Sequence, residues 1–507
     1  MDNRGFSLII TIAFLLFSLI SGLSFSIMIQ NEVESVIKSN NSNLTFYLAE
    51  AGIEKGISEL LKDSSYKGET GTPLGKGYFD VEVSKLGNNQ YQIVSTGYLN
   101  NGNSKRIEVI INNGESVSPV FDYSYFINNW GWYWGRNITS NGDVRSNGRF
   151  DFVGSPKVEG HIYAGDEIDD HGRKIRGSGG QEDHQHAYSE KLVMPNLQEL
   201  DYYMELATDR GGQVKIGGAL VIDNVFGDDP FESGNIVLVG TPSQPIEIDG
   251  PVVVTGDVVI KGVVKGQGTI YAGRNIFIAD SLTYKNAPAS PRPASQNPDV
   301  VDGWVEANKV KDLLGLASQE NIIVGDYTKD PYFGYYGWDR WWARYWLFSM
   351  GSEDVGMDGI PYTYDEGERD GVFQKEYEDL DGDGVFDDNY NWEDVKTSVD
   401  ITKFDNLPPG VSSFSDIATL YPHKIECIAY TNHAFAGRIG YGVKCNGSVR
   451  SKDKAIVYRN TVTFNYDERI HSKYQDDPNK FIDIGLPVDR TIKTVSWREL
   501  KCSESQF

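Results

Sequence analysis

The sequence has few cysteines and a deficit of positive charge. Only three of its 507 residues are cysteine, so the chain is not a small disulfide-built scaffold. Lys and Arg number 47 against 72 Asp and Glu, and the formal net charge of -25 makes nucleic acid a poor partner. In an oxidising extracellular environment, Cys427 and Cys445 are a plausible disulfide pair, which leaves Cys502 without a partner cysteine. The sequence alone does not fix the pairing.

The sequence also lacks the common catalytic signatures. It contains no GxSxG, no HExxH, no P-loop and no Rossmann glycine pattern. Paired carboxylates for glycoside hydrolysis could still come from distant strands, but no spacing in the chain points to them. We therefore expect a binding and structural role rather than an enzyme.

A long apolar run begins the chain. No charged side chain occurs from Phe6 to Ile29. At about 1.5 Å per helical residue, this run spans the roughly 30 Å apolar layer of a bilayer. Arg4 before it and Glu32 after it favour an N-terminus inside, with the rest of the chain outside the cytoplasm. A cleaved signal peptide is disfavoured by the length of the run, and a plain signal anchor remains an alternative.

The apolar run continues as an amphipathic pattern and is followed by short β-rich segments. Apolar side chains recur at three- and four-residue steps, at Phe46, Ala49, Ile53, Ile57 and Leu60. This pattern predicts one helix over 6–62. The segments 78–83, 91–96 and 105–111, separated by Asn- and Gly-rich turns, predict a small antiparallel sheet within 63–117 that packs on the helix.

Two short motifs stand out in and just before the predicted helix. Arg4-Gly5 followed by Phe6 is similar to the class III prepilin leader, which is cut after the glycine and leaves a methylated Phe. The segment YLAEAGIE, at 47–54, resembles the YxAEAGxE segment of the PilX amino-terminal family of minor pilins. The resemblance covers about sixty residues. It implies a leader over 1–5, processing at Gly5 and Phe6, and assembly with other pilins through the helix. Major pilins carry a Glu where this chain has Ile10, which favours an accessory subunit.

Short β-branched runs with glycine punctuation follow from residue 118. Gly250, Gly256, Gly262 and Gly268 recur at every sixth position, with Val and Ile between them. Short strands that stack without intervening helices predict a parallel β-helix over 118–286, of which we favour the right-handed form. The segment 422–507 is interpreted as a return to this solenoid followed by a C-terminal segment. The predicted fold is therefore mainly β, with one long N-terminal α-helix.

The intervening segment 287–421 is predicted to be an insertion that binds calcium. Its run DLDGDGVFDD matches the start of a calcium loop, with acidic oxygens at the first, third and fifth positions and glycine at the sixth. Position twelve is Tyr390 rather than Glu, so the run is closer to extracellular calcium repeats than to an EF-hand. The predicted ligands are Asp379, Asp381, Asp383, Val385, Asp387 and Asp388. A second site could involve Asp358, Asp365 or Glu366, and a solvated acidic loop is the alternative.

Two aromatic clusters could bind a ligand. Trp130, Trp132 and Trp134 alternate in one run, and a second cluster holds Trp338, Trp341, Trp342 and Trp346. Exposed aromatic platforms suit a glycan or cell-surface ligand, and the second cluster is the predicted platform. A buried mini-core that fixes the insertion is the interpretation that we favour for both clusters.

Histidines and acids cluster at 161–186, and their spacing could hold a transition metal. The residues are His161, His171, His184 and His186 with Asp169, Asp170 and Asp183. The segment matches no zinc signature, so we favour a polar loop.

Together these patterns predict an accessory pilin-like subunit of a type IV pilus or a type II secretion-like filament. It would start in a bacterial membrane and end in an extracellular filament, where its solenoid serves adhesion or filament priming. The alternatives are a surface-anchored β-helix enzyme acting on polysaccharide and a membrane-anchored envelope scaffold that never enters a filament.

Overall fold

The chain forms two compact units. One comprises Met1–Ser116 with Arg490–Phe507, and the other Val117–Asp489. The computed structural model describes residues 4–62, 66–87, 90–195, 197, 200–290, 292–293, 297–328, 349–351, 354, 356–357, 367–368, 370–378, 386, 390–391, 400–438, 442–458, 461–475, 477 and 480–500.

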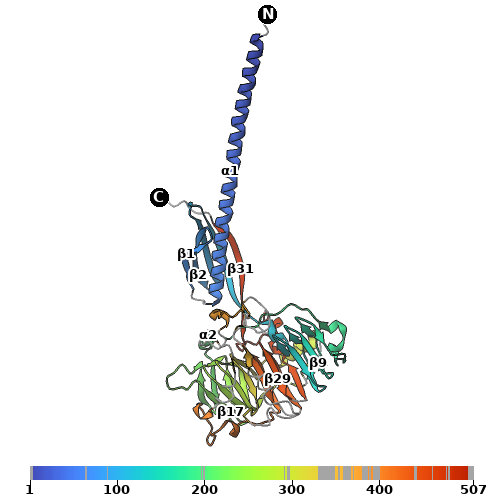
Figure 1. Cartoon of the computed structure of the whole chain (residues 1–507). Coiled ribbons are helices and arrows are strands. Elements are labelled where there is room, and N and C mark those ends of the chain that lie inside the picture. Colours follow the sequence, from blue (N-terminus) through green and yellow to red (C-terminus); the bar gives the residue numbers. More distant parts are fainter. Residues whose placement is uncertain are drawn as a thin grey trace. The chain divides into compact units, whose positions relative to one another are not determined.

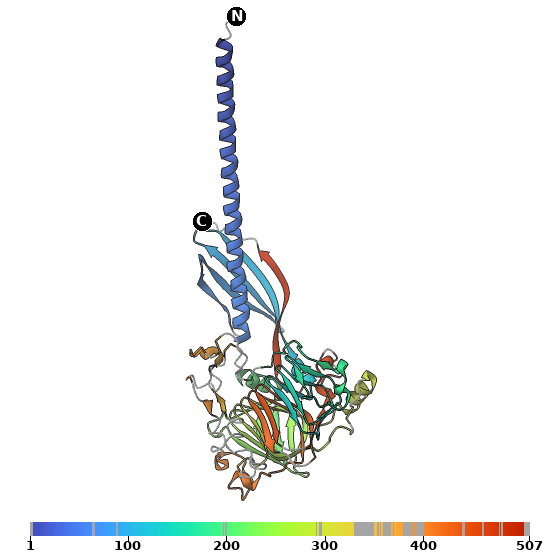
Figure 2. The same ribbon diagram turned by 45° about the vertical axis from the view of Figure 1, so that its right-hand side comes forward.

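The first unit contains one long helix and a five-stranded sheet. Helix α1 spans Arg4–Lys62, as the periodicity predicts to within two residues. The sheet order is β1-β2-β3-β4-β31 (Figures 1 and 2), and its strands are β1 Gly68–Leu74, β2 Gly77–Gly87, β3 Gln90–Leu99, β4 Ser104–Val117 and β31 Val488–Leu500. Strands β2, β3 and β4 contain the three predicted segments. Strand β31 shows that the C-terminal segment, for which no pairing was predicted, joins this sheet.

The two halves of α1 have different surroundings within the first unit. The first half is apolar and exposed, and its side chains include Phe14, Phe17, Leu23 and Phe25. Ile10–Leu60 contains a stretch with a mean hydropathy of 2.3, which is long and apolar enough to cross a membrane. The second half packs on the sheet, and its core residues are Ala49, Ile53, Leu60, Phe79, Val81, Tyr91, Ile93, Ile107, Val109 and Ile111.

Glycines permit a close approach between α1 and β3. A Cβ at Gly97 would lie 2.3 Å from the Thr45 carbonyl oxygen and 2.6 Å from the Ala49 nitrogen, both backbone atoms of the helix. A Cβ at Gly52, on the helix side, would lie 2.9 Å from the Phe79 ring. Since real Cβ atoms do not sit so near backbone, the helix can lie at this distance only with glycine at position 97.

The second unit is mostly β, and its strands pair mainly in parallel. Val258 faces Ile276 eighteen positions later, Tyr125 faces Val144 after nineteen, and Lys424 faces Lys444 after twenty. Among the described residues of this unit, the α-helices are α2 Leu200–Arg210, α3 Pro298–Asn308 and α5 Lys375–Glu378. The strands are β5 Tyr125–Ile127, β6 Gly131–Trp134, β7 Ile138–Ser140, β8 Val144–Ser146, β9 Phe150–Val153, β10 Lys157–Val158, β11 Ile162–Ala164, β12 Ile168–Asp169, β13 Gln185–His186, β14 Gln213–Ile216, β15 Ala219–Asp223, β16 Val225–Phe226, β17 Ile236–Gly240, β18 Ile246–Asp249, β19 Val252–Val254, β20 Val258–Ala272, β21 Ile276–Tyr284, β22 Leu313–Ser318, β23 Ile322–Val324, β24 Ser349–Gly351, β25 Tyr390–Asn391, β26 Lys424–Thr431, β27 Ala434–Arg438, β28 Val443–Ser451, β29 Lys454–Tyr458 and β30 Val462–Tyr466.

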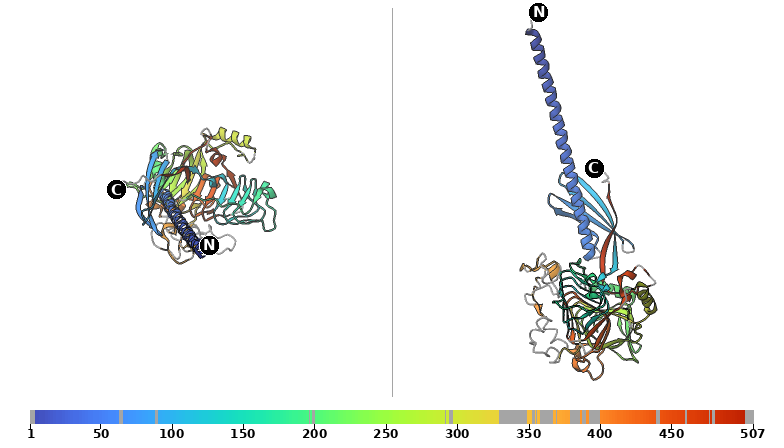
Figure 3. Two further views of the ribbon diagram at one scale, coloured as in Figure 1. Left: turned by 90° about the horizontal axis from the view of Figure 1, so that it is seen from above. Right: turned by 90° about the vertical axis from the view of Figure 1, so that its right-hand side faces the viewer.

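The strands do not stack in sequence order. Strand β28 pairs in parallel with β26 on one side and with β5 on the other, so Val449 faces Tyr125. Strand β30 likewise pairs with β7. In Figure 3 the cyan strands accordingly lie beside the red and orange ones. Residues 125–186 therefore extend the ladder from its C-terminal strands, a connection that no local sequence pattern signals.

Two strands of the ladder fall inside the predicted insertion. Strand β22 pairs in parallel with β20 and β26, and β23 pairs with β21 and β27. The prediction of an insertion over 287–421 is therefore wrong for residues 313–324. Their side chains are buried on both strand faces, which is why the run lacks the alternation that would have identified it.

Apolar side chains fill the ladder, and further segments cover two of its outer faces. Val258, Ile276, Ile322 and Phe435 belong to the inner core. Outward-facing Val259 and Phe277 pack against Ile401, Phe404 and Phe414, from the segment 401–420. Another outer face packs against α2 and the segment 466–486, with Tyr203, Tyr271, Tyr430 and Ile484 among its members.

Polar side chains link successive strands at one corner of the ladder. Asn275 Nδ2 donates to Asp257 Oδ1 at 3.1 Å, and Asn321 Nδ2 donates to Asn275 Oδ1 at 3.0 Å. The chain of contacts continues through His433 and Asp453 to Asn129, whose Nδ2 donates to Asp453 Oδ1 at 3.0 Å. This chain of contacts therefore joins the strands near the C-terminus of the unit to those near its N-terminus and helps to fix their register.

Candidate functional site

A second, smaller sheet of the same unit carries the candidate site. Its order is β12-β9-β6, with both pairings parallel. Trp132 on β6 faces Asp151 on β9, which in turn faces Asp169 on β12. Because these residues are in register, one aromatic and two acidic side chains form a row across the three strands.

Alternation along β6 separates its inward and outward side chains. Gly131 and Tyr133 are buried, while Trp130 and Trp134 are 41% and 52% exposed. The ring centroids of Trp130 and Trp132 are 5.9 Å apart, and those of Trp132 and Trp134 are 5.5 Å apart. The favoured prediction of a buried mini-core is therefore wrong for Trp130 and Trp134.

Arg149 organises the acidic side chains beside the tryptophans. Its Nε lies 2.6 Å from Asp151 Oδ1, its Nη1 lies 3.0 Å from Glu167 Oε1, and Nη2 pairs with Asp169. Hydrogen bonding to Asp151, together with the charges of all three carboxylates, raises the pKa of Arg149 above its ordinary value. Trp130 Nε1 donates to the other oxygen of Asp151 at 2.9 Å, so the aromatic and charged groups form one connected surface.

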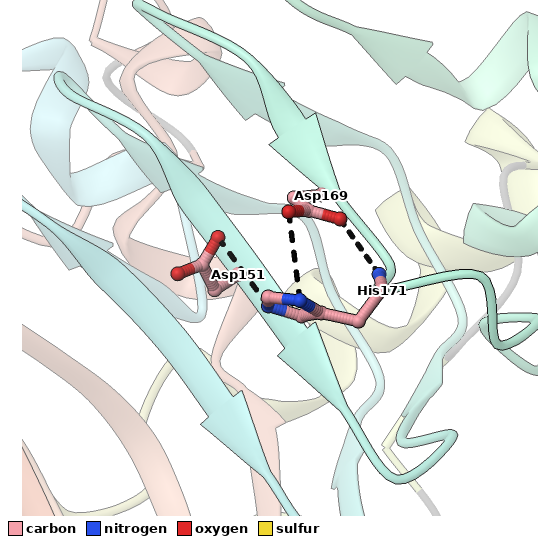
Figure 4. A group of neighbouring side chains, drawn as sticks. All are labelled: Asp151, Asp169 and His171. Atoms are coloured by element: carbon pink, nitrogen blue, oxygen red, sulfur yellow. Dashed lines mark hydrogen bonds and ion pairs between the residues drawn. The ribbon is translucent and has the colours of Figure 1, made fainter.

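Asp151, Asp169 and His171 also lie close enough together to be considered as a cation site. Figure 4 shows the His171 ring between Asp151 and Asp169. His171 Nε2 is 3.9 Å from Asp151 Oδ1, and its Nδ1 is 3.6 Å from Asp169 Oδ2. The backbone N–H of His171 donates to Asp169 and lowers the pKa of that carboxyl. Both carboxylates already bind Arg149, so a metal ion would have to displace the guanidinium. We therefore interpret this group as an ion-pair network.

This face offers two kinds of contact to a ligand. The exposed indole rings present apolar faces, while Arg149 and the three carboxylates present donors and acceptors within the same surface. One guanidinium against three carboxylates leaves the polar part of this face acidic. The face therefore suits a neutral or cationic ligand that has both apolar and hydroxyl-rich sides.

Most of the predicted site residues lie outside the described residues. These are the calcium ligands Asp379, Asp381, Asp383, Val385, Asp387 and Asp388, the weaker candidates Asp358, Asp365 and Glu366, the platform Trp338, Trp341, Trp342 and Trp346, and Cys502. The predicted processing residues Gly5 and Phe6 lie within α1.

The predicted disulfide is not formed, because Cys427 and Cys445 are both free and buried. Their strands are adjacent, but Cys427 faces Gly447 and Cys445 faces Ile425. A two-residue offset on neighbouring strands separates Cα atoms by about 8 Å, beyond the reach of a disulfide. Burial raises the pKa of the Cys445 thiol to about 12, so the thiol is neutral and unreactive.

Sequence reasoning missed Arg149 and Asp151. Both lie in the run NGRFDFVG, which shows ordinary strand alternation. Their importance comes from the parallel register with β6 and β12, which only the fold supplies. The four clustered histidines divide into two groups, because His171 joins Asp151 and Asp169, while His161, His184 and His186 meet elsewhere.

Known proteins give little direct similarity. No protein-family model matches the chain, and no curated protein sequence does. The crystal structure of the competence-associated pilin ComZ from Thermus thermophilus is similar over 91% of this chain and 98% of that chain, with 10% sequence identity and a TM-score of 0.28. A TM-score this low does not establish a common fold.

Proposed function

We propose that this chain is an accessory pilin-like subunit of a type IV pilus or a related secretion filament. The two-part character of α1 carries the proposal. Its first half exposes side chains such as Phe17, which is 70% exposed, while its second half is fixed to the sheet of the first unit. An apolar helix of this length needs lipid or other apolar helices around it. A pilin-like subunit meets this need first in the membrane and later among the helices of a filament.

Processing at Gly5 and Phe6 follows from the leader-like sequence at the start of the chain. With Ile10 in place of an acidic residue, the subunit is accessory rather than self-polymerising. We propose that the parallel strands of the second unit form a β-solenoid, whose role in an extracellular filament is adhesion or priming. The DLDGDG segment would bind calcium as structural support. No catalytic role is proposed.

Fractionation of a pilus-bearing bacterium that expresses the full chain tests the filament assignment. The wild-type chain should appear in the sheared filament fraction. Gly5→Leu should block leader removal and hold the chain in the membrane. Gly303→Leu is the control, because position 303 lies in α3 of the second unit rather than in the assembly helix, and a Cβ there has nothing within 4 Å. A wild-type chain found only in the membrane fraction would instead support the envelope scaffold.

The outer face of β6, β9 and β12 is the proposed adhesive site, with a glycan as its ligand. Indole faces stack on the apolar faces of sugar rings, and the adjacent carboxylates and guanidinium bind hydroxyl groups. The acidic balance of Arg149, Asp151, Glu167 and Asp169 favours neutral sugars or hexosamines over uronate polymers.

Co-sedimentation of the detergent-solubilised full chain with cellulose, chitin and pectate tests this site. Binding to cellulose or chitin should be lost in Trp132→Ala/Trp134→Ala. It should persist in Trp497→Ala, which removes a half-exposed tryptophan from β31 in the other unit. Equal binding by both variants would refute the site, and release of soluble sugar would favour the polysaccharide-active enzyme.

A further inference from the structure

Three of the seven histidines of the chain meet at one edge of the parallel ladder. His161 precedes β11, His184 ends the short helix η3 Glu182–His184, and His186 lies on β13. Strand β13 pairs in parallel with β11 and places His186 opposite Tyr163. The fold therefore joins residues that are separated by more than twenty positions in the sequence.

The imidazoles are in direct contact. His161 Nδ1 is 2.9 Å from His186 Nε2. The rings of His161 and His184 are stacked, with centroids 4.4 Å apart and an interplanar angle of 15°. Tyr163 also stacks on His186, with ring centroids 4.6 Å apart, and limits the orientations of that ring.

Carboxylates flank the three rings. Asp183 Oδ1 lies 3.0 Å from His184 Nδ1, and Asp143 Oδ1 accepts the backbone N–H of His161 at 2.8 Å. Carboxylates near coordinating histidines fix the ring orientation and offset the charge of a bound cation.

We propose that His161, His184 and His186 form a binding site for a divalent transition metal ion of the zinc class. Imidazole nitrogens are preferred by Zn²⁺, Ni²⁺ and Cu²⁺, whereas Ca²⁺ takes oxygen ligands. Two histidines on one tetrahedral Zn²⁺ place their nitrogens about 3.3 Å apart, close to the separation of His161 and His186. His184 supplies a third nitrogen after a side-chain rotation away from its stack on His161, and water completes the set.

This assignment does not depend on the filament role and differs chemically from the predicted calcium loop. It also differs from the Asp151, Asp169 and His171 group, in which Arg149 already occupies the carboxylates. The histidine cluster connects β13 to the rest of the ladder, so an ion bound there would cross-link its terminal strands.

Isothermal titration with Zn²⁺ on the chelator-treated, detergent-solubilised full chain tests the site. We expect one zinc ion per chain, in the presence of millimolar Ca²⁺. His161→Gln and His186→Gln should each weaken binding at least 100-fold, and His184→Gln should weaken it about tenfold. His423→Gln, which replaces an exposed histidine outside the cluster, should bind like wild type.

X-ray absorption of the zinc-loaded wild-type chain gives a readout that does not depend on how the variants fold. Two or three imidazole nitrogens at about 2.0 Å would support the assignment. An all-oxygen shell, no zinc binding by the wild-type chain, or unchanged affinity in His186→Gln would overturn it.

Discussion

Replacement of Gly97 by alanine should weaken the packing of the second half of α1 on its sheet. The added Cβ would lie 2.3 Å from the Thr45 carbonyl oxygen, 2.6 Å from the Ala49 nitrogen and 2.7 Å from Leu48 Cβ. Two of these atoms are helix backbone, so no side-chain rotation relieves the clash, and the helix has to move. Overpacking of this kind costs about 1–3 kcal/mol, against a gain of about 0.4–1 kcal/mol from a stiffer unfolded chain. The expected net loss is about 1–2 kcal/mol.

Hydrogen–deuterium exchange of the full chain in detergent measures this loss locally. A loss of about 1–2 kcal/mol accelerates exchange of the β3 amides and of the helix amides at 45–60 by about 5- to 30-fold. Gly22→Ala is the matched control, because it adds the same methyl group to α1 where nothing lies within 4 Å. Exchange in Gly97→Ala within twofold of this control would refute the close-packed interface.

Three further predictions concern the second unit. Asp467→Asn should destabilise it by about 3–5 kcal/mol in urea unfolding, because Arg469 and Arg292, each 2.8 Å from the carboxylate, would lose their buried counter-ion. Burial opposes ionisation of the Asp467 carboxyl, but the two arginines outweigh burial and hold its pKa below the ordinary value. The stability that ionised Asp467 adds is therefore present above about pH 4 and falls as the pH drops further. If wild-type stability fell no more steeply with acid than that of Asp467→Asn, this pH dependence would be contradicted. Gly262→Ala should lower the unfolding midpoint, because Gly262 has φ +94° and a Cβ added there would lie 1.9 Å from the Gly240 carbonyl oxygen. The control Gly303→Ala should be neutral or stabilising, because a Cβ added at position 303 has nothing within 4 Å. Asp381→Asn/Asp383→Asn should abolish a calcium-binding isotherm with a dissociation constant of about 0.1–1 mM, and an unchanged isotherm would exclude the DLDGDG loop as its source.

Local patterns predict the first unit well. The periodicity of Phe46, Ala49 and Ile53 gives the docked half of α1, and alternation gives β2, β3 and β4. Strand β31 escapes prediction because it pairs with a sheet that begins more than 370 residues earlier. The local sequence of this edge strand, with exposed Val495 and Trp497, does not indicate which strand it pairs with.

The second unit shows where sequence reasoning fails. Six-residue glycine spacing predicts short strands separated by glycine turns, but Gly262 and Gly268 both lie inside the 15-residue strand β20. It does not reveal that β5 pairs with β28, since parallel pairing leaves no mark on either strand. The Trp132, Asp151 and Asp169 row and the histidine cluster both depend on such pairings, and neither could be assembled from spacing alone.

Mass spectrometry of the N-terminal peptide of the native protein tests the central proposal most directly. A pilin-like subunit should begin at Phe6 with a methylated amino group, because the leader is removed after Gly5. A chain that retains Met1 to Gly5 would contradict the proposal and leave a membrane-anchored protein that does not enter the filament pathway. A chain that begins well beyond Ile29 would show that the apolar run is an ordinary secretion signal.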